Sequence, residues 1–124
     1  MGDLRRDPGL DALLDLDGEV LVVDPAGGHW VKFRIKRVEP SPDRPHGLDC
    51  SVTLHGPDGE RLAGIDNAHS VRSSRGPGGA RRTSRDHRHR YRAVQPYDYT
   101  DAATLLEDFW ADVDAVLKDR GVTP

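Results

Sequence analysis

The sequence predicts an α+β fold in which a roughly five-stranded antiparallel sheet packs against one C-terminal amphipathic helix. Three observations lead to this prediction. Short segments that alternate between apolar and polar residues follow one another up to residue 95, turn residues rich in glycine and proline separate them, and the apolar spacing changes to three and four after Thr100. A period of two is typical of half-buried strands, and a spacing of three and four is typical of a helix that covers a sheet.

Strand signals occupy most of the first 95 residues, after a short run of leucines that can form one or two helical turns. Strands are expected at residues 21–23, 30–38, 48–55, 61–66 and 89–95. Within 30–38, Lys32, Arg34 and Lys36 fall on one side, which predicts a half-buried strand with a basic outer face. The Pro-Asp-Gly turn at 57–59 is so short that its two strands must be antiparallel neighbours. Short turns throughout favour a meander in which strands pair in chain order.

The C-terminal segment carries the clearest helical pattern of the chain. Its apolar residues recur at spacings of three and four, at Leu105, Leu106, Phe109, Val113, Val116 and Leu117. Thr100 is the expected N-cap residue, and Gly121 is the expected first residue beyond the C-cap. Acidic side chains of this segment are interpreted as a solvated face: Glu107, Asp108, Asp112, Asp114 and Asp119.

Length and composition point to one domain that spans residues 1–124. Of the 124 residues, 35% are hydrophobic and 31% are charged, and the apolar residues are grouped in periodic runs, which argues against wholesale disorder. No stretch approaches the ~20 apolar residues of a membrane span, and the N-terminus lacks the apolar core of a signal peptide, so no membrane partner and a cytoplasmic location are expected. Cys50 is the only cysteine and is interpreted as a small core residue.

Charge is distributed unevenly, although the formal net charge is only -3. Between Ser70 and Arg92, eight arginines stand against one acidic residue, Asp86, while the rest of the chain has 10 basic and 20 acidic residues. Residues at about 70–86 are rich in glycine, serine and arginine and show no apolar period, which predicts a flexible loop. A strongly positive segment on an acidic body suggests a polyanion or an acidic protein surface as partner.

The meander predicts that polar residues far apart in the sequence meet at one edge of the sheet. The end of strand 61–66 and the starts of strands 48–55 and 89–95 would lie together there. The residues expected at this edge are His46, Asp66, Asn67, His69, Asp86, His87 and His89, whereas His29 and His55 are expected at the opposite end. A different strand order would scatter them.

Several kinds of chemistry fit such a cluster. Imidazole exchanges protons near neutral pH, so histidines beside carboxylates can act as general base and acid while arginines hold a phosphodiester, as metal-free RNA cleavage requires. Histidine with carboxylate is also ordinary metal chemistry. The simplest alternative is a solvated basic patch, with Asp66 and Asn67 in a turn. Trp30 and Trp110 are interpreted as core or interface residues in preference to base-stacking platforms.

The sequence resembles the TumE family of small toxins from bacterial and archaeal toxin-antitoxin modules. The likeness covers about three quarters of the chain and includes the run 45–55, Gly64-Ile65-Asp66-Asn67-Ala68-His69, Asp86-His87-Arg88-His89, and Tyr97-Asp98-Tyr99 followed by 105–110. Many members carry Asp-Asn-Ala-Pro-His-His and His-His-Lys-His, so one histidine is absent here from each signature. The resemblance implies that the functional candidates are Asp66, Asn67, His69, His87 and His89, and it implies a target in translation or RNA.

The leading hypothesis is a toxin that acts on RNA without a cofactor. His69, His87 and His89 would share the acid and base roles, with Asp66 and Asp86 orienting them. Nucleic-acid contacts are expected from Asn67, Arg88, Arg90, Arg81, Arg82, Lys32, Arg34 and Lys36. The alternatives are a non-catalytic module that binds nucleic acid or an antitoxin, and a metal-dependent hydrolase. RNA and a cognate antitoxin protein are the expected partners, and a homodimer is possible.

Overall fold

The computed structural model of the protein describes residues 9–42, 47–67 and 86–123. It contains a six-stranded sheet in the order β1-β2-β3-β4-β5-β6, in which every neighbouring pair is antiparallel. The elements are α1 (Leu10–Asp15), β1 (Val20–Asp24), β2 (His29–Arg37), β3 (Leu48–His55), β4 (Arg61–Asp66), β5 (His87–Arg90), β6 (Ala93–Pro96) and α2 (Ala102–Asp119). The α+β class and the meander are therefore confirmed.

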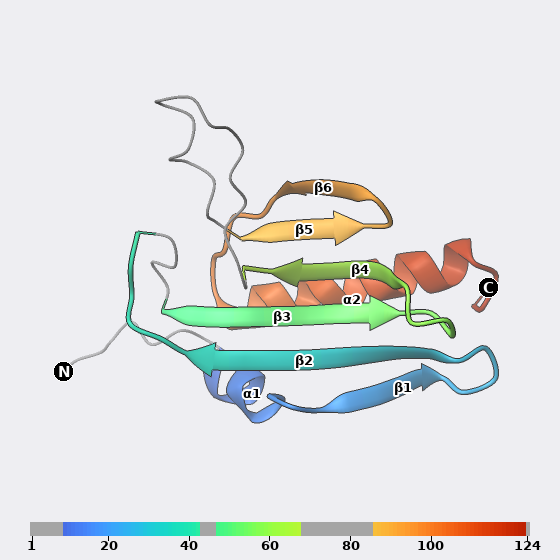
Figure 1. Ribbon diagram of the computed structural model, residues 1–124, viewed down its shortest axis with the longest axis horizontal. Coiled ribbons are helices and arrows are strands. Elements are labelled where there is room, and N and C mark those ends of the chain that lie inside the picture. The colour runs from blue at the N-terminus through green and yellow to red at the C-terminus, as the bar shows by residue number, and fades with distance from the viewer. Residues whose placement is uncertain (1–8, 43–46, 68–85, 124) are drawn as a thin grey trace.

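Helix α2 covers one face of the sheet and leaves the other open (Figure 1). Because side chains alternate along β2, Phe33 lies on the face toward the helix. Its ring packs edge-on against Phe109 with centroids 5.9 Å apart. The core is built from such residues of β2, β3, β4 and α2, and each is at most 5% exposed: Val31, Phe33, Ile35, Cys50, Val52, Leu54, Ala63, Ile65, Leu105, Phe109, Val113, Val116 and Leu117. Cys50 is thus the core residue that the sequence predicted.

The ends of α2 follow from specific capping contacts. Asp101, and not the predicted Thr100, is the N-cap residue, because its side-chain Oδ1 accepts a hydrogen bond from the backbone N–H of Thr104 at 2.7 Å. At the other end Gly121 adopts φ 79°, as predicted, and the N–H of Val122 bonds back to the carbonyl of Leu117 at 2.8 Å. No helix in the described ranges is long and apolar enough to cross a membrane.

The predicted fifth strand at 89–95 is two strands in the structure. The chain turns at Tyr91 and Arg92 between β5 and β6, and Tyr91 has φ 54°, a left-handed conformation that is uncommon for a tyrosine. The sequence contains no glycine or proline at this point to indicate the turn. The loop predicted at about 70–86 lies almost wholly outside the described residues, as do His46, His69, Arg81 and Arg82.

Candidate functional site

Strand β5 divides its side chains between the two faces of the sheet. The register pairs Asp66 with His87 and Gly64 with His89, so both histidines lie on the open face, as Asp66 does. Their ring centroids are 6.5 Å apart. Arg88 and Arg90 alternate with them and lie on the face that α2 covers. The predicted meeting of Asp66 with the two histidines at one sheet edge is what the strand pairing produces.

His89 lies between the carboxylate of Asp66 and the guanidinium of Arg61. Its Nε2 lies 3.1 Å from Asp66 Oδ2, and its Nδ1 lies 3.2 Å from Arg61 Nη2. Arg61 Nη1 is also 3.6 Å from Asp66 Oδ2. Because a guanidinium can only donate, Nδ1 of His89 must accept and Nε2 must carry the proton. The imidazole is therefore neutral, and its lone pair points to Arg61.

The surroundings of His89 lower the pKa of its imidazole. The largest cause is burial, which penalises the charged form; the residue is 9% exposed. The carboxylate of Asp66 opposes this shift, while the positive charge of Arg61 and the neighbouring His87 add to it. A histidine kept neutral near physiological pH is in the protonation state of a general base.

Arg61 was not among the residues that the sequence predicted for the site. Simple alternation along β4 would place it on the face opposite Asp66 and Gly64, beside Ile65. The pairing of β3 with β4 instead shifts register between Leu54 and His55, so that Arg61 lies opposite His55 and its side chain reaches the open face. Gly64 inside β4 is the one signal that a bulge could accompany, but a glycine does not indicate at which residue the register shifts.

Asn67 and Asp86 lie in a buried hydrogen-bond network at the end of β4. The Asn67 side chain accepts from the backbone N–H of Cys50 at 2.8 Å and donates to the carbonyl of Leu48 and to Asp86 Oδ1, each at 2.9 Å. Asn67 is 5% exposed and Asp86 is 7% exposed. The amide continues the ladder beside β3 after β4 ends. Asn67 and Asp86 are close to the histidines, but their polar groups are engaged within the fold.

Arg88 and Arg90 are bound by one carboxylate of α2. Asp112 Oδ2 accepts from Arg88 Nε at 2.7 Å, and its Oδ1 accepts from Arg88 Nη2 at 2.9 Å and from Arg90 Nη2 at 3.2 Å. Asp112 is 3% exposed, so the expectation that it belongs to a solvated face is wrong. The guanidinium of Arg88 also lies 5.8 Å from the ring centroid of Tyr97. The structure thus separates both arginines from the histidines, on the opposite face.

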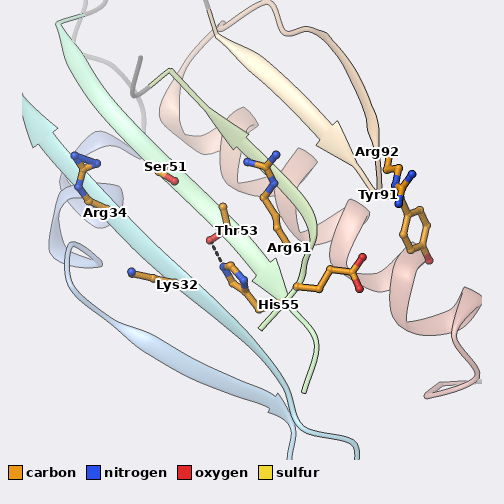
Figure 2. A pocket seen from close by; sticks show the side chains of 9 residues that line it. Lys32, Arg34, Ser51, Thr53, His55, Arg61, Tyr91 and Arg92 are labelled. Carbon is orange, nitrogen blue, oxygen red and sulfur yellow. Dashed lines mark hydrogen bonds between the residues drawn. The ribbon is translucent and has the colours of Figure 1, made fainter. Parts of the chain in front are cut away.

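The open face carries a basic hollow of about 570 Å³ next to His89 (Figure 2). Cationic side chains enter it from three directions: Lys32 and Arg34 from β2, Arg61 from β4 and Arg92 from the β5–β6 turn. The rest of the lining is Ser51, Thr53, His55, Glu60 and Tyr91. Lys32 and Arg34, from the basic strand face that the sequence predicted, therefore form one wall of a concave surface. Lys36 lies outside the hollow, paired with Asp17 at 3.1 Å.

His55 is fixed at the end of β3 by contacts at both ring nitrogens and on one face of its ring. Its Nε2 is 2.9 Å from Thr53 Oγ1, and its Nδ1 is 3.1 Å from the carbonyl oxygen of Gly59. The carbonyl can only accept, so Nδ1 donates and Nε2 accepts from the hydroxyl. Trp30 stacks on the imidazole with ring centroids 4.2 Å apart and an angle of 14° between planes. His55 was placed at the opposite end from the histidine cluster, as the structure has it, but was not predicted as a site residue.

Within the described ranges, no three histidine, cysteine, aspartate or glutamate side chains come close enough together to hold a metal ion. His46 and His69 lie outside those ranges. Asp66 and His89 use their contacting atoms on each other and on Arg61.

Comparison with known proteins agrees with the resemblance seen in the sequence. The family model described as Toxin TumE matches residues 26–117, more than half of the chain. The matched region contains β2 to β6 and most of α2, and with them every described residue of the histidine site and the basic hollow. No curated protein and no solved structure matches the chain.

Proposed function

The chain belongs to the TumE toxin family, and we propose that it is a toxin that cleaves RNA on the open face of its sheet. The observation that carries this proposal is the contact of His89 with Asp66 on one ring nitrogen and with Arg61 on the other. A neutral imidazole oriented by a carboxylate, with a cation beside its lone pair, has the parts that phosphodiester cleavage needs.

The proposed reaction is attack of a ribose 2′-hydroxyl on the adjacent phosphate. His89 Nδ1 accepts the 2′-hydroxyl proton, a bond forms between O2′ and phosphorus, and the bond from phosphorus to O5′ breaks. His87, 6.5 Å from His89 between ring centroids, gives a proton to the departing O5′. Atoms and charge balance, and the products are a 2′,3′-cyclic phosphate and a free 5′-hydroxyl.

Arg61 has two roles in this proposal. Before substrate binds, it occupies the lone pair of His89, and its positive charge adds to burial in lowering the pKa of the imidazole. When a phosphate arrives, the guanidinium turns to the phosphate oxygens, which are stronger acceptors than an imidazole, and this movement frees Nδ1 as the base. Its side chain is 41% exposed, so it has room to move.

The cations of the basic hollow would bind the flanking phosphates. Lys32, Arg34 and Arg92 line it, and they supply sequence-independent affinity that falls with salt. Lys36 would extend this contact along β2. Arg81, Arg82 and His69 keep their predicted roles in phosphate binding and proton transfer as part of the same proposal.

Cleavage of single-stranded RNA by the purified protein tests this function. His89→Ala is expected to reduce the rate about 10²- to 10⁴-fold, as expected for loss of a general base, and to relieve growth arrest in cells. Arg61→Ala should also reduce cleavage, whereas Arg37→Ala, an exposed arginine at the end of β2, should not. Cyclic phosphate ends and full activity in EDTA are expected. Unchanged cleavage by His89→Ala would refute the mechanism, and loss of activity in EDTA would favour a metal-dependent hydrolase.

A non-catalytic binding module is the second candidate. It is favoured by one observation, that Arg61 occupies the only lone pair on the His89 ring. In that case the protein binds RNA in a salt-sensitive way and leaves it intact. The same cleavage assay separates the two candidates.

The proposed partners and location follow from the toxin role. A cognate antitoxin would bind the toxin in the cytoplasm, where RNA and the translation machinery are found. A homodimer is a further part of the proposal, tested by the mass of the protein in solution.

A further inference from the structure

We propose that the basic hollow binds an unpaired nucleobase of the RNA, stacked on the His55 ring. This inference rests on the proposed function, because it names the form of RNA that the site accepts. A base in a duplex is already stacked between its neighbours, so the substrate would be single-stranded.

The ring of His55 can contact a ligand through its face, because its polar edge already makes hydrogen bonds within the protein. Thr53 and Gly59 engage both of its nitrogen atoms, which leaves a face of the ring for contact with a ligand. Those two contacts also fix the ring in one orientation, and a platform that is already fixed loses little entropy when a base binds.

The second face of the His55 ring points into the hollow. Trp30, from β2, covers the first face. His55 lines the hollow, and the lining residues Arg61, Tyr91 and Arg92 come from β4 and the β5–β6 turn, on the side of β3 away from Trp30. Lys32 and Arg34 line it from β2. Figure 2 shows His55 at the end of β3, with Arg61 on the neighbouring strand and Tyr91 and Arg92 beyond it. A base stacked on His55 would therefore lie within the hollow, on a platform two rings thick.

The hollow has the size and chemistry for one nucleotide. Its volume of about 570 Å³ is in the range of small-molecule sites. Arginine and lysine side chains at the wall suit the phosphates on either side of the base, while stacking tolerates any of the four bases. The lining is too polar for an apolar ligand, since it contains four cations and three hydroxyls among its nine residues.

The position of His55 relative to His89 indicates which nucleotide is bound. Thr53 and His89 both pair with Gly64, so they share a row two strands apart, about 10 Å. His55 lies two residues further along β3, which places it about 12 Å from His89 by strand spacing and rise. The stacked base therefore belongs to a nucleotide beside the scissile bond and not to the one whose 2′-hydroxyl reacts.

Binding of a short single-stranded RNA with every 2′-hydroxyl methylated tests the inference, because such RNA cannot be cleaved. His55→Ala is expected to weaken binding about ten-fold, the usual loss for one stacked base. His55→Phe keeps a flat ring but not the hydrogen bonds, and it should bind nearly as tightly as the unaltered protein. Removing the base at the stacked position of the RNA should weaken binding to the unaltered protein by the same factor. It should leave binding to His55→Ala unchanged.

Tryptophan fluorescence gives a second measurement that does not need a His55 variant. The protein has two tryptophans, so Trp110→Phe leaves Trp30 as the only one. Emission from Trp30 should change when the blocked RNA binds, since a base joins the stack of which Trp30 is part. The blocked strand annealed to its complement should bind more weakly and leave the emission unchanged.

The outcomes separate this inference from the proposed function. Binding by His55→Ala equal to that of the unaltered protein, or equal loss in His55→Ala and His55→Phe, would overturn the stacking site alone. Binding of the blocked RNA through His55, with no cleavage of unmodified RNA, would overturn the cleavage proposal alone. Absence of any binding by the unaltered protein would overturn both.

Discussion

Replacing Asp112 by asparagine is expected to lower the free energy of unfolding by about 2–3 kcal/mol. The carboxylate is 3% exposed and accepts three hydrogen bonds from Arg88 and Arg90. Asparagine has nearly the same shape but no charge, so it leaves two guanidinium groups without their counter-charge. Removing one partner of a fully buried ion pair costs about 3–5 kcal/mol. The Arg88 and Arg90 side chains are 28% and 49% exposed, and access to water reduces the expected loss.

Urea unfolding followed by tryptophan fluorescence measures this loss. Asp114→Asn is the matched control, because Asp114 is an exposed aspartate on the same helix and its replacement should change stability by less than about 0.5 kcal/mol. In the double variant with Arg88→Met, the two losses should not add, since the first substitution already breaks the pair. A loss for Asp112→Asn no greater than the control, or full additivity, would refute the role assigned to this ion pair.

Three further predictions concern single side chains. Arg61→Leu should raise the pKa of His89 toward its ordinary value, because the positive charge of Arg61 is one of the causes that lower it, and the shift is measurable from histidine proton NMR against pH. The depressed pKa of His89 also makes stability fall as pH drops below about 6.5, the unfolded value, and this fall should shrink in Arg61→Leu. Cys50, with its pKa raised to about 12 by burial, should resist a thiol reagent at pH 8 until urea unfolds the protein. Asn67→Ala should cost about 2–3 kcal/mol of stability, since it removes the buried hydrogen bonds that the side chain makes with the backbone of Leu48 and Cys50, and protein that remains folded should keep its affinity for RNA.

Periodicity predicted most of the fold because each strand has one buried face. The strands at 48–55 and 61–66 have the predicted bounds, and α2 follows the predicted apolar spacing. Their apolar sets are buried on one side, so a shift by one residue would expose all of them, and the sequence therefore specifies the register strongly. The β5–β6 hairpin was missed because its turn uses Tyr91 in a left-handed conformation, where the statistics of turns favour glycine or asparagine.

The candidate site was only partly predictable for a related reason. Asp66, His87 and His89 were found because strand order alone brings them together. The position of Arg61 on the open face depends on a β-bulge, which changes the face on which a side chain lies without any change in residue type. The burial of Asp112 depends on Arg88, a partner 24 residues earlier in the chain. From the sequence alone, an acidic residue next to an apolar stripe cannot be distinguished from a solvated one.

The alternation in β5 connects the proposed chemistry to the stability of the fold. His87 and His89 lie on the open face of the sheet, while Arg88 and Arg90 between and after them bind α2 through Asp112. β5 has only four residues and pairs on its outer side with a β6 whose side chains are all exposed, so few apolar contacts hold it. The contacts of the two arginines with Asp112 therefore attach β5 to α2, as apolar contacts attach β2 and β3 to it. This explains why a strand so rich in basic residues can position His89 against Asp66. For the proposed function, the basic character of β5 is therefore not by itself a measure of RNA affinity, because Asp112 pairs with both of its arginines and the proposed phosphate contacts come from β2, β4 and the β5–β6 turn.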